Sequence, residues 1–455
     1  MAQLQRRHVQ QQQISHFCFF SRSFAAIRQS ASATVPSASP KPHVPLPPTN
    51  NNSSWNPQHL RPVPAFYPLE KSTRLVEDAV PNVASRLADC LRALSIQAHF
   101  DDQAGTASLL TGDHVEMHLC LWSPPKNFEG VLVELQRRKG DSVAFHRYSR
   151  TILDAAIGDL DVNELDVDAD VVYSKKIQRM LEGQSEDELE NAVVALEIVN
   201  NLLMKDRMDA RQLGLESLCL LTDPRKTGYL TAVLASHVVL LGNTNGVEIP
   251  GSKADLLDEA LAQGIQETIL GLVQFSEIGE DNPKDAMENS IEAEHLTVLH
   301  NLALAVLANS LDVIENPDRF DDEPEDVKPR GRLRTASSTD VTNEFLQASE
   351  ESSSKEILKT LISELGNAGT KPHDAALSAK CLGSLLRASD EAQKRAKELG
   401  AKTVVSTALD VGVRTHAKLE VESQKVLDAL QQQPSRTETQ EIRREDLEEE
   451  EEEEE

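Results

Sequence analysis

One acidic run in the chain has nearly the spacing of a calcium-binding loop. Asp159, Asp161 and Asn163 fall at the first, third and fifth positions of such a loop, and Asp170 falls at the twelfth. The sixth position, where the sharp turn needs glycine, is Glu164, and the twelfth is aspartate instead of a bidentate glutamate. We therefore expect an acidic linker here and no calcium site.

The residue patterns that mark catalytic centres are missing from the sequence. It has no glycine-rich phosphate loop, no His-Glu-x-x-His pair and no Gly-x-Ser-x-Gly turn. His114 and His118 alternate in a predicted strand, which favours a strand surface over a metal pair. Widely spaced cysteines form no ligand or disulfide framework, as is typical of a reducing compartment: Cys18, Cys90, Cys120, Cys219 and Cys381. We expect a protein that is not an enzyme and holds no cofactor or metal.

Ser337 follows Arg332 and Arg334 at the spacing that basophilic kinases favour. The motif lies in residues 315–354, whose many acidic, serine and threonine residues and few apolar ones predict a disordered loop. A phosphate would add a charge of about −1.5 to −2 beside the two arginines. Ser337 is therefore a candidate phosphorylation site.

Residues 72–158 are predicted to form a small α+β module. An apolar stripe predicts a helix over residues 72–94, with Pro81 kinking or restarting it. Residues 142–157 predict a closing helix. Between the helices, alternating segments predict a four-stranded antiparallel sheet, at 97–101, 106–111, 114–122 and 130–137.

The end of this module, Gln136-Arg137-Arg138-Lys139-Gly140-Asp141-Ser142-Val143-Ala144-Phe145, resembles the last strand, turn and final helix of a kinase-associated-1 (KA1) domain. The resemblance covers about 85 residues. It implies a module that holds anionic phospholipids or docks on a neighbouring domain. An ordinary solvated strand edge and helix face is the alternative. Clustered cations gain roughly 1 kcal/mol each near an anionic leaflet, so the candidate contacts are Arg137, Arg138, Lys139, Arg147 and Arg150.

Helical patterns occupy residues 185–314 and 355–431. In the clearest of them a stripe with spacings of three and four is followed by a break at Gly400 and a new stripe. The stripe consists of Leu377, Cys381, Leu382, Leu385 and Leu386. Such a helix buries its apolar face only against neighbours, and the glycine between helices resembles that of an armadillo repeat. The resemblance implies an armadillo-like α-solenoid that binds and does not catalyse.

Two segments, Ala195–Leu202 and Ala303–Asn309, look like the third armadillo helix, whose inner asparagine clamps an extended peptide. The resemblance nominates Asn201 and Asn309 for partner binding, and ordinary surface asparagines are the alternative. The groove tryptophans of nuclear-import receptors have no counterpart in the array, so we do not expect import-signal recognition.

The composition of the chain limits its possible folds and functions. Aromatic residues make up 4% of the chain and the net charge is −28, which favours helical folds and argues against nucleic-acid binding. Residues 1–69 contain no acidic residue and are predicted to be a disordered leader, with an organelle transit peptide as the alternative. Residues 159–184 read as an acidic linker and 432–455 as a disordered acidic tail, which ends in eight glutamates. No run of eighteen apolar residues predicts a membrane span.

These observations predict a mainly α protein: an armadillo-like solenoid preceded by the α+β module. The expected function is a non-enzymatic scaffold or regulatory adaptor for a protein partner with basic or extended segments. A possible further contact is an anionic membrane surface. Two alternatives stay open, an organelle-imported structural factor and an acidic chaperone-like binder of basic proteins. The expected location is cytoplasmic, or plastid or mitochondrial if the leader is a transit peptide.

Overall fold

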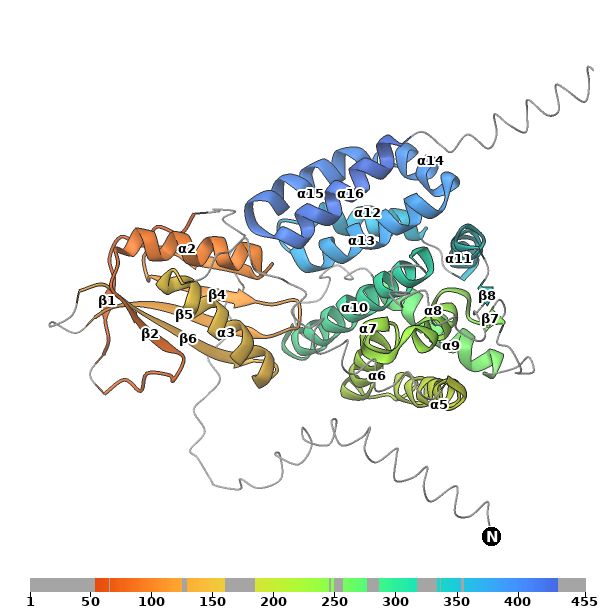
Figure 1. Ribbon diagram of the computed structural model, residues 1–455, viewed down its shortest axis with the longest axis horizontal. Helices are drawn as coiled ribbons and strands as arrows, with labels where there is room; N and C mark the ends of the chain where they lie inside the picture. Colours follow the sequence, from red (N-terminus) through yellow and green to blue (C-terminus); the bar gives the residue numbers. More distant parts are fainter. Residues whose placement is uncertain are drawn as a thin grey trace, which may run out of the picture. The chain divides into compact units, whose positions relative to one another are not determined.

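The structure of the protein is a computed structural model, and the residues it describes are 54–64, 66–124, 129–159, 185–244, 247–248, 257–275, 286–316, 334–335, 337–352 and 356–432. These residues are mainly helical, with one small antiparallel sheet (Figure 1). The predictions for the leader before residue 54, for the linker over residues 160–184 and for the tail after residue 432 fall outside the described residues.

The sheet belongs to the α+β module. Its strands lie in the order β2-β6-β5-β4-β3 and are antiparallel, and short β1 adds a parallel pairing to the end of β5. The bounds are β1 Arg61–Pro62, β2 Thr73–Val76, β3 Gln97–Asp101, β4 Thr106–Leu110, β5 Glu116–Ser123 and β6 Val131–Lys139. The predicted meander is confirmed in β3 to β6, and β2 adds a strand at its edge.

Two helices, α2 (Val80–Ala93) and α3 (Ser142–Ile157), complete the module and pack against each other and the sheet. Alternation in the strands explains the core, because Leu119, Leu121 and Val133 point to the side of the sheet that shares a buried cluster with the helices. The predicted closing helix is α3, with Asp141 as its N-cap. Its side chain accepts hydrogen bonds from two backbone amides of the first turn.

The start of the module differs from the prediction in two ways. The single helix expected over residues 72–94 is wrong, because β2 precedes α2 and the helix begins at Val80 with Pro81 in its first turn. The folded part also begins earlier than residue 72. Trp55 is 4% exposed and stacks on Phe100 with ring centroids 5.2 Å apart, so residues from 54 onward belong to the module and not to the leader.

The helical region comprises the described residues from 185 to 432. Its helices are α5 Ser185–Leu203, α6 Met208–Leu221, α7 Pro224–Thr227, α8 Tyr229–Leu241, α9 Glu259–Val273, α10 Ala286–Glu315, α11 Ser338–Ser352, α12 Ile357–Gly366, α13 Pro372–Ala388, α14 Asp390–Glu398, α15 Ala401–Thr415 and α16 Ala417–Gln431. Two-residue strands β7 (Val247–Glu248) and β8 (Arg334–Thr335) pair antiparallel beside them.

Each helix of the helical region packs on several others, most of them nearby along the chain. Helix α6 packs on α10, α10 on α13, and α13 on α16, while α12 packs on α15. One continuous buried cluster of Leu, Ala, Val and Ile side chains runs from Leu189 in α5 to Leu430 in α16. No helix of this set has a core of its own, because each apolar stripe is buried by the helices beside it.

Helix α10 is long, apolar and largely buried from Leu299 onward. Its segment Ala293–Glu315 is long and apolar enough to cross a membrane by length and composition, and 67% of the apolar window is buried by the rest of the chain. Packing against α6, α8, α9 and α13 accounts for this apolar surface. The same composition is therefore that of a core helix.

The prediction of a disordered loop over residues 315–354 is wrong in part. Helix α11 occupies Ser338–Ser352, and its Phe345 is 0% exposed in the core of the helical region. Few apolar residues suffice here because Val341 and Phe345 lie four apart on one face and both are buried.

The predicted break at Gly400 is confirmed. This residue has φ 74° between α14 and α15, in the left-handed region that glycine adopts without strain.

Candidate functional site

Helices α10 and α13 each expose one narrow stripe. Between Leu299 and Asn316 most of α10 is buried, and the half-exposed positions recur at spacings of about three and four. They are Leu302, Ala305, Asn309, Asp312, Glu315 and Asn316. On α13 the half-exposed or exposed positions with the same spacing are His373, Leu377, Lys380 and Arg387. Because α10 packs on α13, these two stripes form one surface.

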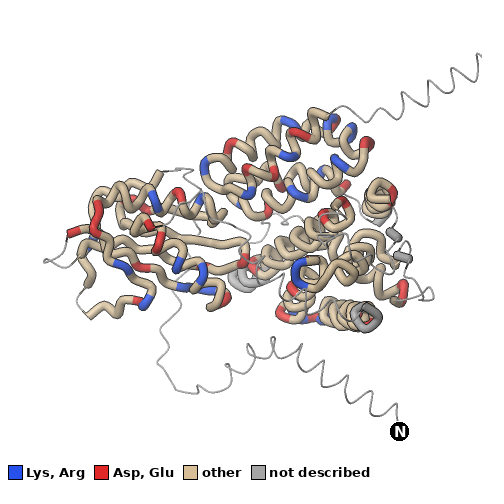
Figure 2. The backbone as a smooth tube through the Cα atoms, viewed as in Figure 1, with Lys and Arg blue, Asp and Glu red and all other residues tan. Residues whose placement is uncertain are grey.

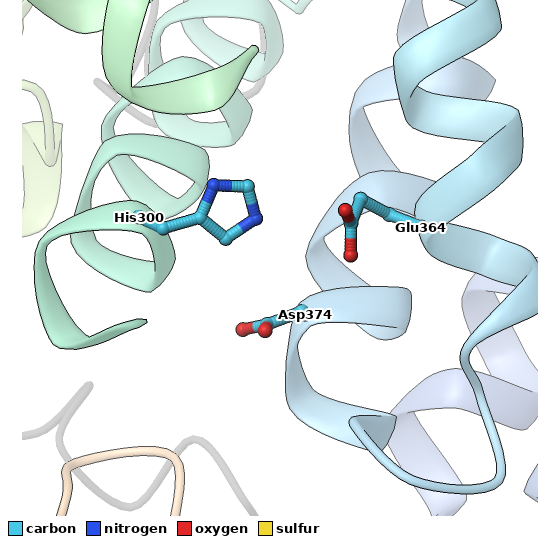
Figure 3. A group of neighbouring side chains, drawn as sticks. All are labelled: His300, Glu364 and Asp374. Atoms are coloured by element: carbon cyan, nitrogen blue, oxygen red, sulfur yellow. The ribbon is translucent and has the colours of Figure 1, made fainter. Parts of the chain in front are cut away.

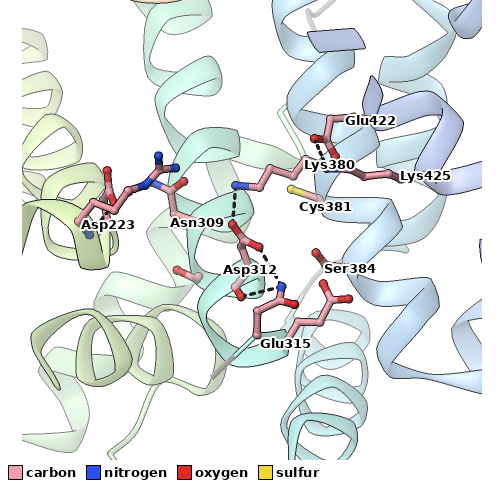
Figure 4. Close-up of polar contacts among 12 residues, drawn as sticks. Asp223, Asn309, Asp312, Glu315, Lys380, Cys381, Ser384, Glu422 and Lys425 are labelled. Carbon is pink, nitrogen blue, oxygen red and sulfur yellow. Dashed lines mark hydrogen bonds and ion pairs between the residues drawn. The ribbon is translucent and has the colours of Figure 1, made fainter. Parts of the chain in front are cut away.

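Ion pairs tie the polar ends of the stripes together. Lys380 Nζ lies 3.0 Å from Asp312 Oδ2 (Figure 4). Arg387 Nη2 donates to Glu315 Oε2 over 2.8 Å. The hydrogen bond to Glu315 raises the pKa of the Arg387 guanidinium above its ordinary value. We call this set the stripe surface: Asn309, Asp312 and Glu315 of α10, with Lys380 and Arg387 of α13.

Helix α16 adds a third pair next to these, Lys425 with Glu422 at 2.8 Å. Charges of both signs are also interspersed along the neighbouring helices of this part of the chain (Figure 2). The stripe surface is thus polar and half-buried, with its charges already matched. Each pair is partly exposed, so each contributes little to folding, about 0 to 1 kcal/mol.

The two asparagines nominated for partner binding do not share a position. Asn309 is half-buried, and its Nδ2 donates to the Cys219 carbonyl at the end of α6 over 3.4 Å. Asn201 is exposed near the end of α5, which packs on α6, α8 and α9. Helix α6 therefore packs against the helices of both residues. Only Asn309 lies on the stripe surface.

The five basic residues proposed for anionic contacts are all exposed at the end of β6 and on α3. Most have acidic neighbours: Lys139 Nζ lies 3.5 Å from Glu116 and from Glu294, Arg147 lies 3.4 Å from Asp113, and Arg150 lies 3.8 Å from Asp154. Arg137 donates to the Gly140 carbonyl, and Arg138 is exposed. The cluster is a mixed-charge surface and not a purely cationic one.

Ser337 is exposed immediately before α11, and its carbonyl accepts from the Val341 amide. Arg332 lies outside the described residues. A phosphate on Ser337 would therefore sit at the N-terminus of α11, where helix dipoles favour negative charge.

Polar contacts join the module to the helical region within the compact unit that both share. Arg92 at the end of α2 donates through Nε to the Val413 carbonyl over 2.6 Å and pairs through Nη2 with Glu420 at 2.5 Å. The Lys418 amide donates to Ser95 Oγ over 2.9 Å. Ser95 is 3% exposed and has φ 57°, so a strained residue supplies this contact.

Two histidines extend the same junction, His373 in the first turn of α13 and His416 between α15 and α16 (Figure 1 shows these helices). The Leu419 amide donates to His416 Nδ1, so the proton of the neutral ring is on Nε2, which lies 3.1 Å from His373 Nδ1. His373 must then donate from Nε2 to the Leu110 carbonyl of β4, 3.0 Å away. Burial lowers the pKa of both rings, to about 3 for His416, which keeps this chain of hydrogen bonds neutral.

A second polar cluster lies between α10, α12 and α13 (Figure 3). Ligand atoms of His300, Glu364 and Asp374 are all within 4.8 Å of one another. His300 Nδ1 lies 2.8 Å from the Leu272 carbonyl, and Asn301 Nδ2 donates to Asp374 Oδ1 over 2.5 Å. Sequence motifs could not reveal this cluster, because its three members come from three helices.

Comparisons with known proteins do not identify the chain. No protein-family model and no curated protein matches it. Among solved structures, two engineered proteins from the Northeast Structural Genomics Consortium are similar in part. The first is 12% identical with a TM-score of 0.19, and the match covers 52% of this chain and 96% of the engineered protein. The second is 13% identical with a TM-score of 0.20, and the match covers 63% of this chain and 71% of the engineered protein. TM-scores this low carry no argument about fold or function.

Proposed function

We propose that the protein is a non-enzymatic scaffold or regulatory adaptor. In this proposal the helical region is an armadillo-like solenoid, and its stripe surface binds an extended segment of a protein partner. The observation that supports it is the chain of contacts from α10 to α13 and from α13 to α16, with α12 packed on both α13 and α15. Repeated helical hairpins stacked in this way give extended binding surfaces.

The chemistry of the stripe surface favours a charged or polar partner segment. Lys380 and Asp312 are half-exposed, so a partner side chain can exchange for one member of the pair at a cost of about 1 kcal/mol or less. The net charge of the chain is −28, which attracts basic segments over a distance of about a Debye length. A partner with basic residues in an extended segment therefore fits best.

The contacts at Arg92, Ser95 and the two histidines favour intramolecular docking as the role of the α+β module. Docking would hold the module against the first turns of α13 and α16 and the last turn of α15. Sedimentation with phosphatidylserine vesicles tests the membrane alternative. Vesicle binding by the full chain that is lost in Arg137→Ala/Arg138→Ala would favour a membrane contact instead.

Affinity purification of the full chain followed by quantitative mass spectrometry tests the scaffold proposal. The variant Lys380→Glu/Arg387→Glu reverses two charges of the stripe surface, and Lys394→Glu/Lys402→Glu is the matched control on exposed positions of α14 and α15. We expect partners retained by the parent and the control to be lost in the stripe variant. The same partners retained by all three proteins would contradict the proposal.

A further inference from the structure

We propose that His300, Glu364 and Asp374 form a binding site for one divalent transition-metal ion, with Zn²⁺ as the ion that fits best. This site is independent of the scaffold proposal and lies between α10, α12 and α13. The three side chains point toward a common space from their separate helices (Figure 3). Their ligand atoms lie within 4.8 Å of one another.

His300 is already in the tautomer that a metal requires. A backbone carbonyl only accepts hydrogen bonds, so the 2.8 Å contact with Leu272 places the ring proton on Nδ1. Nε2 of the neutral ring then carries a free lone pair, and the ring is 6% exposed and aimed at the two carboxylates. A ligating histidine whose other nitrogen donates to a carbonyl is the usual arrangement around protein-bound metals.

Asp374 is oriented in a comparable way. It is 4% exposed, and the buried Asn301 amide donates to its Oδ1, which leaves Oδ2 available as a ligand. Such hydrogen bonds from neighbouring side chains fix the direction of a ligating carboxylate. Asn301 is adjacent to His300 on α10, so this helix supplies one ligand and positions another.

The charges at the site also call for a cation. Glu364 lies in the last turn of α12, where the helix dipole disfavours a carboxylate, and it shares the space with Asp374. Among the described residues, no lysine or arginine forms an ion pair with either carboxylate. Partly buried carboxylates this close together without a cationic partner are costly, and a divalent ion would neutralise both at once.

The donor set selects the kind of metal. One imidazole nitrogen with two carboxylate oxygens suits zinc and similar transition metals, whereas calcium and magnesium prefer oxygen ligands only. Zinc takes ligands at about 2 Å, and three protein ligands leave a fourth position for water or a group of a partner. A bound ion would thereby tie α10 to the α12–α13 hairpin.

Melting temperatures of the full chain, measured in EDTA and in 100 µM Zn²⁺, give the first test. Removing the charge with Glu364→Gln should leave the EDTA melting temperature unchanged or higher, because it relieves an unneutralised carboxylate. Zn²⁺ should raise the melting temperature of the parent by several degrees and that of Glu364→Gln by much less. The order of stability should therefore reverse when zinc is added.

Isothermal titration of the metal-free full chain with Zn²⁺ gives the second test. We expect one site in the parent and in the exposed control Glu391→Gln, with affinity at least 10-fold weaker in Glu364→Gln and in His300→Gln. Circular dichroism of each variant in EDTA checks that it is folded. One folded ligand variant is enough for the comparison with the parent. Absence of a zinc site in the parent, or equal affinity in the parent and a folded ligand variant, would overturn the proposal.

Discussion

At the scale of single residues, His237 is the clearest titrating group. It lies on α8, is 0% exposed, and its two ring nitrogens have no hydrogen-bond partner among the described residues. Burial lowers its pKa to about 4. An unfolded chain binds a proton at an ordinary histidine pKa of about 6.5, so the free energy of unfolding is highest above pH 6.5 and decreases as the pH falls toward 4.

This linkage predicts a loss of about 2 kcal/mol in the free energy of unfolding between pH 7 and pH 5 from His237 alone. The substitution His237→Leu removes the titrating group and replaces it with an apolar side chain of similar size. We expect urea unfolding to show a pH-dependent loss that is about 2 kcal/mol larger in the parent than in the variant. Equal losses in both proteins would assign the pH dependence to other groups.

Asn309 gives a second prediction at this scale. Its hydrogen bond to the Cys219 carbonyl is long, at 3.4 Å, and half-buried, so Asn309→Ala should lower the free energy of unfolding by about 0.5 to 1 kcal/mol. Unfolding in urea measures this loss. If Asn309 also contacts a partner, the same variant should reduce partner retention while circular dichroism stays as in the parent. The exposed Asn201→Ala is the matched control, and a loss of stability there of the same size would contradict this account.

Sequence reasoning was least complete for individual residues. It placed Asn309 on a helix surface but gave no sign that the side chain bonds to α6, because that carbonyl is 90 residues away. His300 and Asp374 were missed for the same reason, since their positions in separate helical patterns carry no spacing motif. Contacts made by tertiary packing are invisible to local periodicity.

At the scale of elements, prediction was more successful where apolar stripes are long. Helix α13 and strands β3 to β6 lie where the periodicity placed them, because each has a buried face with a regular repeat. Helix α11 was missed because only a few apolar residues define its buried face. The segment around Trp55 was assigned to the leader because its proline-rich composition hides one buried aromatic anchor.

The turn at Gly400 provides a prediction for an element. Its φ of 74° is unfavourable for any residue with a Cβ, and no atom lies within 4 Å of the place where a Cβ would stand. Gly400→Ala should therefore cost about 1 to 2 kcal/mol through backbone strain alone. Urea unfolding measures the loss.

Gly271 is the matched control for this prediction. It is exposed within α9 with no atom within 4 Å of an added Cβ, and its backbone is helical. Gly271→Ala should raise the free energy of unfolding by about 0.5 to 1 kcal/mol, because alanine favours the helix. If both variants changed the free energy of unfolding in the same direction, the backbone conformation at Gly400 would not be the cause of the change.

At the scale of the whole molecule, the central claim is that the helices from α5 to α16 share one core and are stable only together. Leu385 tests this claim well, since it is 0% exposed on α13, which packs on α10, α12 and α16. An aspartate there buries an unpaired carboxylate at a cost of several kcal/mol, comparable with the stability of a domain. The exposed Val413→Asp on α15 is the control.

Hydrogen exchange of the full-length Leu385→Asp protein is the most direct measurement. A shared core predicts that backbone amides in α10, α12 and α16 lose protection together with those in α13, whereas Val413→Asp retains the protection of the parent. Loss of protection confined to α13, with α10 and α16 exchanging as in the parent, would contradict the stacked array and with it the binding surface that the array presents.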